Sequence, residues 1–304
     1  MGTIEKDLLL AVSDLHQIPS GAFSIRENGK GVQVNSTENI QIIPKGEGNG
    51  IDIYIKENTK NESVHIPVII SKSGIEELVY NDFYIGKNSD VLIVAGCGIH
   101  NTGDSKSSHD GIHRFHLEEG AKVRYVEKHI GVGSGAEKVM NPVTEIEMGE
   151  RSELTMETTQ LGGVSYSERE TFATLEKQAK LVIKEKILTS ENQVAKSKFR
   201  VELVGKDSSA DVVSRSVARD ESYQSFFSSV VGRAECFGHV ECDAIIMDKA
   251  KISATPEILA EDVDSKLVHE AVVGKIAGEQ LIKLMTLGLC EKEAEELIIK
   301  GFLS

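Results

Sequence analysis

The stretch Glu119-Gly120-Ala121-Lys122-Val123 places a small residue between a turn and the first residues of a β-rich run. Similar stretches recur at 150–154 (ERSEL), 177–181 (KQAKL), 206–211 (KDSSAD), 232–236 (GRAEC), 248–252 (DKAKI) and 263–267 (VDSKL). The small residues at their centres lie 31, 27, 30, 25, 16 and 15 residues apart, at Ala121, Ser152, Ala179, Ser209, Ala234, Ala250 and Ser265. Recurrence of this kind is typical of a solenoid, whose coils bury their apolar faces only by stacking on one another. The repeat therefore predicts a mainly β protein built as a β-helix.

The texture around the repeat agrees with this prediction. Short β-rich runs with polar alternation follow one another from Phe23 to Val273, and the whole chain has only 5 prolines. No regular alternation of strands and helices suggests a doubly wound sheet. Because evenly spaced turns also occur in β-sandwiches, a sandwich of hairpins remains the alternative.

Helical patterns occur only near the two termini. Leu8, Val12 and Leu15 fall on one helical face, and Pro19-Ser20-Gly21 ends that element. The second pattern follows Gly274, where Gly288 separates two helices and Gly301 closes the last one. We therefore expect an N-terminal helix and linker (1–22), a β-helix core (23–273) and a C-terminal helical hairpin (274–304). The hairpin either caps the solenoid or docks a partner.

The charge of the chain excludes some partners. It has 34 Lys+Arg and 48 Asp+Glu residues, which give a formal net charge of −14. Nucleic acids and anionic membrane surfaces attract proteins through basic side chains, so neither is an expected partner. The longest uncharged apolar run, Val91 to Ile99, is far too short for the roughly 20 residues of a membrane-spanning helix.

The N-terminus and the cysteines indicate the compartment. Acidic residues interrupt the first apolar stretch, which does not resemble a secretion signal. The 4 cysteines are too few for a disulfide framework, and none form a CxxC pair. We expect a cytoplasmic protein with free thiols or thiolate ligands.

Two nucleotide-binding motifs are excluded. The segment from Gly131 to Ala136 fits a glycine-rich dinucleotide fingerprint, but Pro142 follows too soon for the helix that this motif needs. This segment is predicted to be a loop. No GxxxxGK[ST] sequence is present, so the chain is not expected to hydrolyse ATP alone.

Histidines are concentrated in one region. Five of the 9 lie between positions 100 and 129, at His100, His109, His113, His116 and His129. Residues three apart in a strand point to opposite faces, so His113 and His116 do not form the HxH pair of a cupin metal site. Two interpretations remain: solvated loop histidines, or a zinc, iron or proton-relay site that uses His100, His109 and His113.

Two further segments carry chemistry-bearing side chains. In a strand, Cys236 and Cys242 share one face and His239 lies on the other. Either thiol is as easily a buried core residue as a ligand. His269 and Glu270 stand in the apolar run LVHEAVVG, where burying two polar groups is costly unless they have partners or a purpose.

These residues carry a resemblance to a known family. SKLVHEAVVGKIAGEQLIKLMTLGLCEKEAEELIIKGF (265–302) resembles the C-terminal region of the SufB/SufD proteins of the SUF iron-sulfur cluster assembly system. HVECDAII, the later ATPEI and the upstream VAGCGIH extend the likeness over roughly residues 80 to 302. The resemblance is to a short SufB-like form.

The resemblance implies a fold, partners and site residues. It implies a right-handed parallel β-helix, a C-terminal region that binds the ABC-type ATPase SufC, and dimerisation through the β-helix, here as a homodimer. Cys242 and Glu270 correspond to SufB residues implicated in holding a nascent cluster, and His269 to a histidine shared with SufD. Cys97 corresponds to a cysteine implicated in accepting sulfur. Lys128-His129 differs from the polar-aromatic pair that SufB carries near its sulfur path.

The function implied is a scaffold rather than an enzyme. Iron and sulfide would be assembled on it into a transient cluster and passed to apoprotein clients, with ATP hydrolysis in the partner subunit. Thiolates suit iron, and a weaker carboxylate or imidazole ligand keeps the cluster transferable. The alternatives are a SufD-like structural partner that holds no cluster, and a His-ligated metalloprotein.

Overall fold

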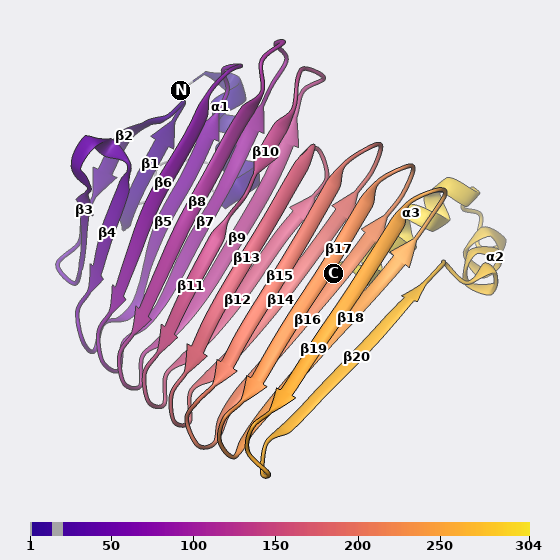
Figure 1. Cartoon of the computed structure of the whole chain (residues 1–304). Coiled ribbons are helices and arrows are strands. Elements are labelled where there is room, and N and C mark those ends of the chain that lie inside the picture. The colour runs from indigo at the N-terminus through magenta and orange to yellow at the C-terminus, as the bar shows by residue number, and fades with distance from the viewer. Residues whose placement is uncertain (1, 14–20) are drawn as a thin grey trace.

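The chain folds into two long sheets that face each other, and it passes from one sheet to the other along its length (Figure 1). This computed structural model describes residues 2–13 and 21–304. The first sheet has the order β2 (Lys30–Asn35), β1 (Ala22–Glu27), β5 (Lys60–Ile70), β7 (Asp90–His100), β9 (Lys122–Val132), β12 (Glu153–Leu161), β14 (Lys180–Thr189), β16 (Ser208–Ala218), β18 (Cys236–Ile246) and β20 (Lys266–Gly274).

The second sheet runs alongside in the same direction. Its order is β3 (Ile40–Pro44), β4 (Gly50–Ile55), β6 (Glu76–Ile85), β8 (Ser107–Leu117), β10 (Lys138–Met140) followed along the same line by β11 (Val143–Met148), then β13 (Tyr166–Leu175), β15 (Val194–Leu203), β17 (Tyr223–Gly232) and β19 (Lys251–Ala260). Apart from the β1–β2 and β3–β4 pairs, the strand pairs are parallel. The predicted β-solenoid, with about 8 turns, is therefore confirmed. The β-sandwich alternative is wrong, because hairpins would make the strands antiparallel.

The repeated small residues stack on one another at the entrance to the first sheet. The strand registers align Ala121, Ser152, Ala179, Ser208, Cys236 and Ser265. In two coils the sequence predicts Ser209 and Ala234 instead of Ser208 and Cys236, which is an error of one and two residues. Ala250 precedes β19 and so belongs to the second sheet, which explains why the predicted spacing halves near the C-terminus.

The turns between the sheets share a local geometry. The residue before the small residue adopts a left-handed conformation, with φ of +68° at Gly120, +59° at Arg151 and +60° at Asp207. The hydroxyls of Ser152 and Ser208 donate to carbonyl oxygens three residues earlier, at 2.8 and 2.7 Å. A small buried residue fits this tight turn, which is the physical basis of the repeat.

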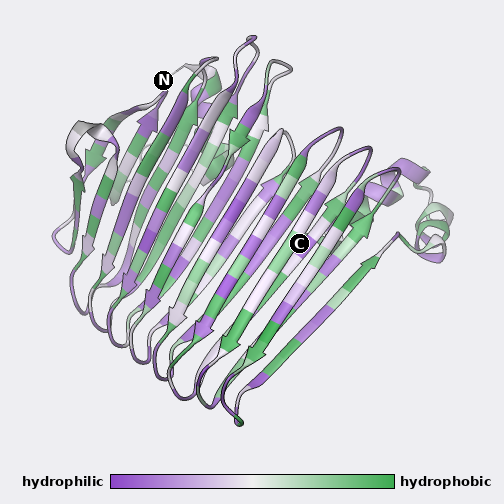
Figure 2. Cartoon of the chain, viewed as in Figure 1, coloured by the Kyte–Doolittle hydropathy of each residue, from purple (hydrophilic) through white to green (hydrophobic). Residues whose placement is uncertain are grey.

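Side chains alternate between the space enclosed by the sheets and the outside. Figure 2 shows the alternation of hydrophobic and hydrophilic residues along the strands. A small apolar cluster contains Cys97, and most of the other enclosed apolar side chains form one continuous core along the solenoid. Aromatic rings stack within it, as in Phe83 and Phe115, whose centroids are 4.4 Å apart.

Helix α1 (Thr3–Ser13) confirms the predicted N-terminal helix and covers the outer face of the first sheet. Leu8 and Val12 are buried there, above Gly96 and Gly98 of β7. The two glycines have no side chain, so the helix approaches the strand closely. Leu15 and the predicted stop at Pro19-Ser20 lie outside the described residues.

The C-terminal hairpin consists of α2 (Gly278–Thr286) and α3 (Glu291–Phe302), as predicted. Gly301 lies inside the last turn of α3 instead of ending it. Ile299 and Leu303 pack on Val217 and neighbouring side chains of the first sheet. The helices therefore cover part of the side of the solenoid, and strands β19 and β20 of the last coil remain largely exposed. Strands begin at Ala22 and end at Gly274, but the division into domains stays a prediction.

Candidate functional site

Cys242 lies on the inner face of β18, near the open end of the solenoid. It is only 2% exposed, and its strand neighbours in register are Ser214 and Ala271. Burial, with smaller contributions from the charges of Glu185 and Asp243, raises the pKa of the Cys242 thiol to about 12. The side chain is therefore a neutral thiol at neutral pH in the described chain.

His269 on β20 faces the same side as Cys242. It lies opposite Val240, two residues before Cys242, so the two side chains are diagonal neighbours on adjacent strands, about 8 Å apart. Both ring nitrogens of His269 are buried, and neither has a hydrogen-bond partner in the structure. Burial, and then the charge of His239, lowers the pKa of His269, so the ring is neutral and has a free lone pair.

Glu270 points the other way. It pairs in register with Glu241, on the outer face of the first sheet. Asp243 lies on the same face, and burial followed by a hydrogen bond with Asp243 raises the pKa of Glu241. The structure thus brings Cys242 and His269 to one face of the sheet and places the third predicted ligand, Glu270, on the opposite face.

Cys97 lies inside the solenoid on β7 and is 1% exposed. Burial raises the pKa of its thiol well above the ordinary value, and the charges of Glu77 and Glu127 add to the rise. The thiol borders a cavity of about 10 Å³, about the space of one water molecule, shared with His109, His113 and other inner side chains.

Gly111 keeps this small cavity open. A Cβ atom there would lie 2.7 Å from Nε2 of His113 and 3.4 Å from Nε2 of His109. Both nitrogens therefore face the space above Gly111. Their Nδ1 atoms are held elsewhere: His109 by Glu77 Oε1 at 3.0 Å, and His113 by the Tyr125 hydroxyl at 3.5 Å.

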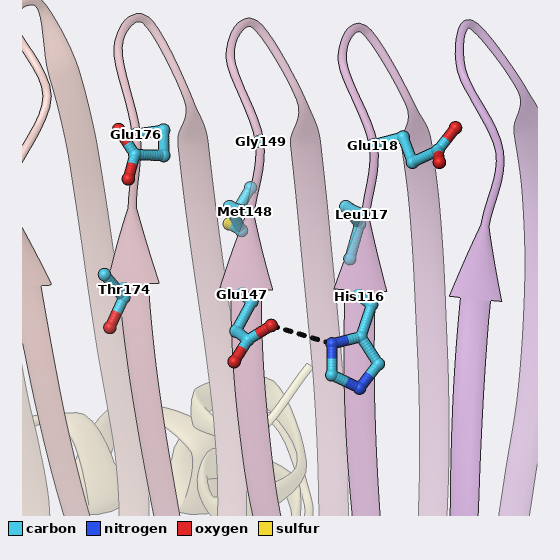
Figure 3. A pocket seen from close by; sticks show the side chains of 8 residues that line it. All are labelled: His116, Leu117, Glu118, Glu147, Met148, Gly149, Thr174 and Glu176. Atoms are coloured by element: carbon cyan, nitrogen blue, oxygen red, sulfur yellow. Dashed lines mark hydrogen bonds and ion pairs between the residues drawn. The ribbon is translucent and has the colours of Figure 1, made fainter.

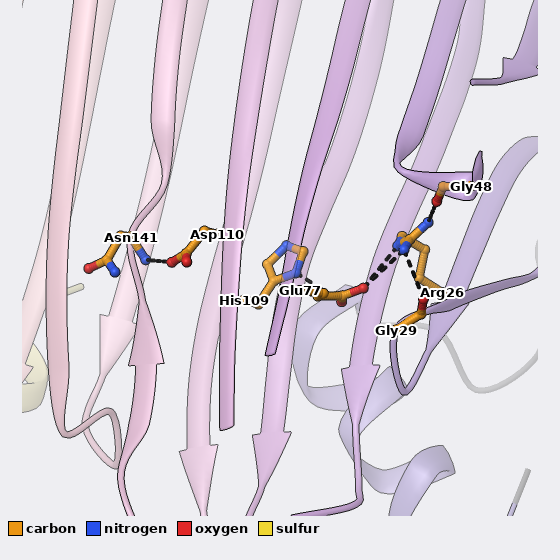
Figure 4. Close-up of polar contacts among 7 residues, drawn as sticks. All are labelled: Arg26, Gly29, Gly48, Glu77, His109, Asp110 and Asn141. Atoms are coloured by element: carbon orange, nitrogen blue, oxygen red, sulfur yellow. Dashed lines mark hydrogen bonds and ion pairs between the residues drawn. The ribbon is translucent and has the colours of Figure 1, made fainter. Parts of the chain in front are cut away.

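The carboxylate of Glu77, which holds His109, also contacts Arg26 of β1. Figure 4 shows Glu77 between His109 and Arg26, whose Nη2 lies 3.0 Å from Glu77 Oε2. Arg26 also donates to the Gly48 carbonyl at 2.8 Å. Burial opposes ionisation of Glu77, but His109 and Arg26 outweigh it and lower its pKa. A buried chain of polar contacts therefore leads from Arg26 through Glu77 to His109, which lines the cavity beside Cys97.

A line of polar side chains crosses the interior between the two cysteines. His129 is the register neighbour of Cys97. On the adjacent inner row, cross-strand neighbours follow in the order Glu127, Thr158, Glu185, Ser214 and Cys242. Such a row is unexpected in a core, since buried polar groups cost free energy unless they are paired.

The charges in this row are compensated by partners on both sheets. Arg169 Nη1 forms an ion pair with Glu127 Oε2 at 2.7 Å. Glu185 accepts hydrogen bonds from Ser197 and Ser214 at 2.7 and 2.8 Å. Burial nevertheless raises the pKa of Glu185, while the pKa of Glu127 is well below its usual range because Arg169 and His129 outweigh burial.

The interpretation of the histidines as solvated loop residues is wrong for three of them. His109, His113 and His129 lie in strands and are buried, because alternation turns them inward. Burial lowers the pKa of His113 to about 4. Within residues 2–13 and 21–304, no group of three or more His, Cys, Asp or Glu side chains is arranged to hold a metal ion. His100, His109 and His113 therefore do not form such a group.

His116 points outward, as the spacing from His113 predicts. Its Nδ1 lies 2.8 Å from Glu147 Oε2, beside an open pocket of about 420 Å³ (Figure 3). Glu118 and Glu176 also line this pocket, and neither interior cysteine does. The predicted loop from Gly131 to Ala136 is confirmed only from residue 133, because residues 133–137 connect β9 and β10 without a helix, whereas Gly131 and Val132 are the last residues of β9.

The interior polar row from Glu127 to Cys242 is not among the features predicted from the sequence. Its members stand six residues after the stacked small residues, as in Ala121 and Glu127, Ala179 and Glu185, and Cys236 and Cys242. This offset could have revealed the row, but only with the small residues aligned correctly in every coil. Two of them were misaligned.

Comparison with known protein families gives a match that includes Cys97, Cys242 and His269. A family described as SUF system FeS cluster assembly, SufBD core domain, matches residues 79–302. An iron-sulfur cluster assembly SufBD family protein of Methanothermobacter thermautotrophicus is 32% identical over 243 residues, which are 78% of this chain and 58% of that protein. The chain thus spans a little over half the length of this relative.

Two further relatives extend the comparison. A SufBD family protein of Pyrococcus horikoshii is 28% identical over 284 residues, covering 90% of this chain and 83% of the relative. SufB of Bacillus subtilis is 35% identical over 103 residues, 32% of this chain and 22% of its own length. In the part of the chain that the structure describes, no helix is long and apolar enough to cross a membrane. The chain belongs to the SufBD family of SUF system iron-sulfur cluster assembly proteins.

Proposed function

We propose that this chain is a non-catalytic scaffold on which iron and sulfide are assembled into a cluster, its cargo, for transfer to apoproteins. The observation that carries the proposal is the pair formed by Cys242 and His269. A thiol and a neutral imidazole face the same side at an open end of the solenoid, and the imidazole has no hydrogen-bond partner. Thiolate and imidazole are both ligands of iron, and a mixed set favours release.

Sulfur delivery from Cys97 is the second part of the proposal. A polar row joins the region of Cys97 to Cys242 through the interior. Ionisable and hydroxyl groups along that row offer hydrogen bonds to a sulfur species that passes between coils, which an apolar core would not. Lys128 points outward from β9, whereas His129 lies in this interior region.

We also propose that a SufC-like ABC-type ATPase binds the C-terminal hairpin. Helix α2 has no buried side chain, and the apolar side chains of Ile282 within it and Leu287 at its C-terminal cap are 63% and 77% exposed. Exposed apolar side chains on one short helix are typical of a docking surface. ATP hydrolysis would take place in that partner, and the four free cysteines suit the reducing cytoplasm.

A homodimer through the last coil is the expected assembly. Strands β19 and β20 end the two sheets without a further strand beside them. The apolar side chains of Ile258, Leu259 and Val272 are exposed there. A second copy would cover these strand edges and would place two Cys242–His269 pairs near one interface.

One observation favours the alternative, a SufD-like structural subunit without a cluster. Cys242 is almost fully buried and its pKa is about 12, so in the isolated chain it behaves as a core thiol. Iron binding would have to displace the thiol proton. Metal coordination lowers thiol pKa values strongly, so the two functions differ in a measurable way.

Anaerobic reconstitution with ferrous iron and sulfide tests the proposal. Cys242→Ser replaces a soft thiolate with a poor hydroxyl donor and is expected to remove most visible cluster absorption and most bound iron and sulfide. Cys290→Ser is the matched control, because Cys290 is exposed at the start of α3. Glu270→Gln is expected to have a smaller effect, and Cys97→Ser none with free sulfide. Wild-type levels in every variant would favour the SufD-like alternative.

A further inference from the structure

A groove crosses the outer face of the first sheet, on the opposite side from the interior cysteines. It has a volume of about 410 Å³ and lies over β9, β12, β14, β16 and β18. Ser304, next to the end of α3, forms part of its rim. Its floor combines the apolar side chains of Val126 and Val213 with the cationic side chains of Lys128, Lys184, Lys186 and Arg215.

Ser304, two residues after the end of α3, lies at one side of this groove, and α3 packs on the sheet beside it. The outward positions after Lys186 and Arg215 on the same strands are Leu188 and Val217, and both pack beneath the helix. The groove therefore begins where the helix stops covering the sheet. Of the cationic side chains in the groove, Lys186 and Arg215 are half-buried and Lys184 is exposed.

The charge pattern in the groove differs from the rest of the outer surface. Elsewhere, cations face carboxylates of neighbouring strands, as in Lys122–Glu153 at 3.1 Å and Arg114–Glu145 at 2.7 Å. Here Lys186 is the direct register neighbour of Arg215. Like charges opposite each other on adjacent strands destabilise a sheet, and an anion bound between Lys186 and Arg215 would offset this repulsion.

Three donor side chains of the groove, those of Lys184, Lys186 and Arg215, have unused hydrogen-bonding capacity within the described residues. Lys184 and Lys186 have no ion pair within the described residues, although Glu157 is the register neighbour of Lys184. The carboxylate of Glu157 pairs instead with Arg124, at 3.2 Å. The Nε atom of Arg215 is buried and has no hydrogen-bond partner.

The remaining carboxylates lie at the β18 edge of the groove. Glu241 Oε1 is 3.9 Å from Arg215 Nη2, too far for a hydrogen bond. Asp243 is the register neighbour of Arg215, and burial followed by a hydrogen bond with Asp243 raises the pKa of Glu241. Within the described residues, no hydrogen bond joins Arg215 to either carboxylate, so its donors remain available to a bound anion.

We propose that this groove binds a phosphorylated small organic molecule, with Lys184, Lys186 and Arg215 around the phosphate and Val126 and Val213 beneath the organic part. Arg and Lys donors from adjacent strands, about 5 Å apart, can converge on the oxygens of one phosphate. The volume exceeds that of inorganic phosphate, and the apolar floor has no role in binding a bare ion. This site is independent of the proposed scaffold function, because its side chains face away from Cys242 and His269.

Titration calorimetry of the full chain at low ionic strength tests the site with AMP, inorganic phosphate, adenosine and citrate. We expect AMP to bind more tightly than phosphate, and adenosine not to bind at millimolar concentration. Lys186→Gln and Arg215→Gln each remove one donor to a charged group, so each is expected to weaken AMP binding about tenfold or more. Lys180→Gln is the matched control, since Lys180 lies exposed on the same strand and face outside the groove.

Several outcomes would overturn the proposal. These are no binding of AMP or phosphate at millimolar concentration, equal weakening by Lys180→Gln, or citrate binding as tight as AMP binding with the same loss in the groove variants. Thermal unfolding of each variant checks its fold, and Arg215→Lys replaces Arg215→Gln if the latter unfolds. Cluster reconstitution in Lys186→Gln is expected to match the wild type, so failure of the site and failure of the scaffold function are distinguishable.

Discussion

His269 shows how a single residue can be suited to a ligand at the expense of local stability. A buried polar group without a partner costs about 1–3 kcal/mol, and both ring nitrogens of His269 are in this position. Evolution toward stability alone would favour an apolar side chain there. The cost is explained if iron binds the imidazole in the working complex.

The variant His269→Leu separates these two effects. It removes the unpaired nitrogens and keeps an apolar side chain of similar size, so the free energy of unfolding of the cluster-free protein is expected to stay the same or rise. Cluster retention after reconstitution is expected to fall, because the imidazole is lost. Denaturant titration and visible absorption measure the two quantities. Lower stability together with full cluster retention would contradict the ligand role.

The thiol of Cys242 makes a prediction about pH. Its pKa is about 12 in the folded chain and near 9.0 in the ordinary state. The folded state therefore keeps a proton that the unfolded state releases, and this contribution to stability is present below pH 9 and is lost as the pH rises toward 12. Wild-type stability is expected to fall more steeply over this window than that of Cys242→Ala. If the free energy of unfolding falls equally steeply with pH in the wild type and in Cys242→Ala, burial does not raise the pKa of this thiol.

At the scale of elements, helix α1 depends on two glycines that flank Cys97. A Cβ at Gly96 would lie 2.6 Å from the Lys128 carbonyl oxygen and 2.8 Å from that of Val12, both backbone atoms that cannot easily move. A Cβ at Gly98 would meet Leu8 and Val12 side-chain atoms at 3.0–3.3 Å, where small shifts suffice. The two positions differ in how well the surroundings can adapt.

We therefore expect Gly96→Ala to lower the free energy of unfolding by about 1–3 kcal/mol, as overpacking does, and Gly98→Ala to lower it less. Gly274→Ala is the control, since nothing lies within 4 Å of a Cβ there. Thermal and denaturant unfolding provide the measurement. The packing of α1 on β7 is refuted if all three variants are equally stable.

Helix α2 makes a prediction about the partner. Replacing Ile282 and Leu287 with Glu removes exposed apolar side chains that make no core contact, so stability is expected to change little. Co-purification with an ABC-type ATPase is expected to be lost. Leu297, on α3, is also exposed, and Leu297→Glu serves as the comparison. Retained association in the α2 variant, measured by pull-down from native cells, would locate docking elsewhere.

At the scale of the whole molecule, the first and last coils of the solenoid differ in how their strand edges are covered. The antiparallel pairs β1–β2 and β3–β4 close the first coils, whereas β19 and β20 leave the last coil open. Val263, in the turn between these two strands, is 98% exposed. Open strand edges with apolar side chains promote association.

The homodimer is tested by a charge at this open end. Ile258→Lys brings two like charges together if two last coils meet, so light scattering is expected to shift from dimer to monomer. Leu161→Lys is the control, because Leu161 is similarly exposed on the outer face of β12, away from the ends. Monomeric wild type at micromolar concentration, or equal effects of the two variants, would count against the last coil as the interface.

The sequence by itself was sufficient for the solenoid, the terminal helices and the family. Each coil contacts its neighbours at a nearly constant distance along the chain, so the small turn residues such as Ala121 and Ser152 recur and can be recognised without a structure. The opposite directions of His269 and Glu270 also follow from strand alternation, since adjacent residues of a strand cannot share a face.

Only the tertiary structure decided which face is enclosed and what gathers there. The row from Glu127 through Glu185 to Cys242 depends on register between coils, and turns of unequal length displace that register by one or two residues. The burial of Arg169 against Glu127 joins two different sheets. The groove at Lys186 and Arg215 depends on where α3 packs. These features arise because contacts between coils, rather than local patterns, set which charges lie side by side.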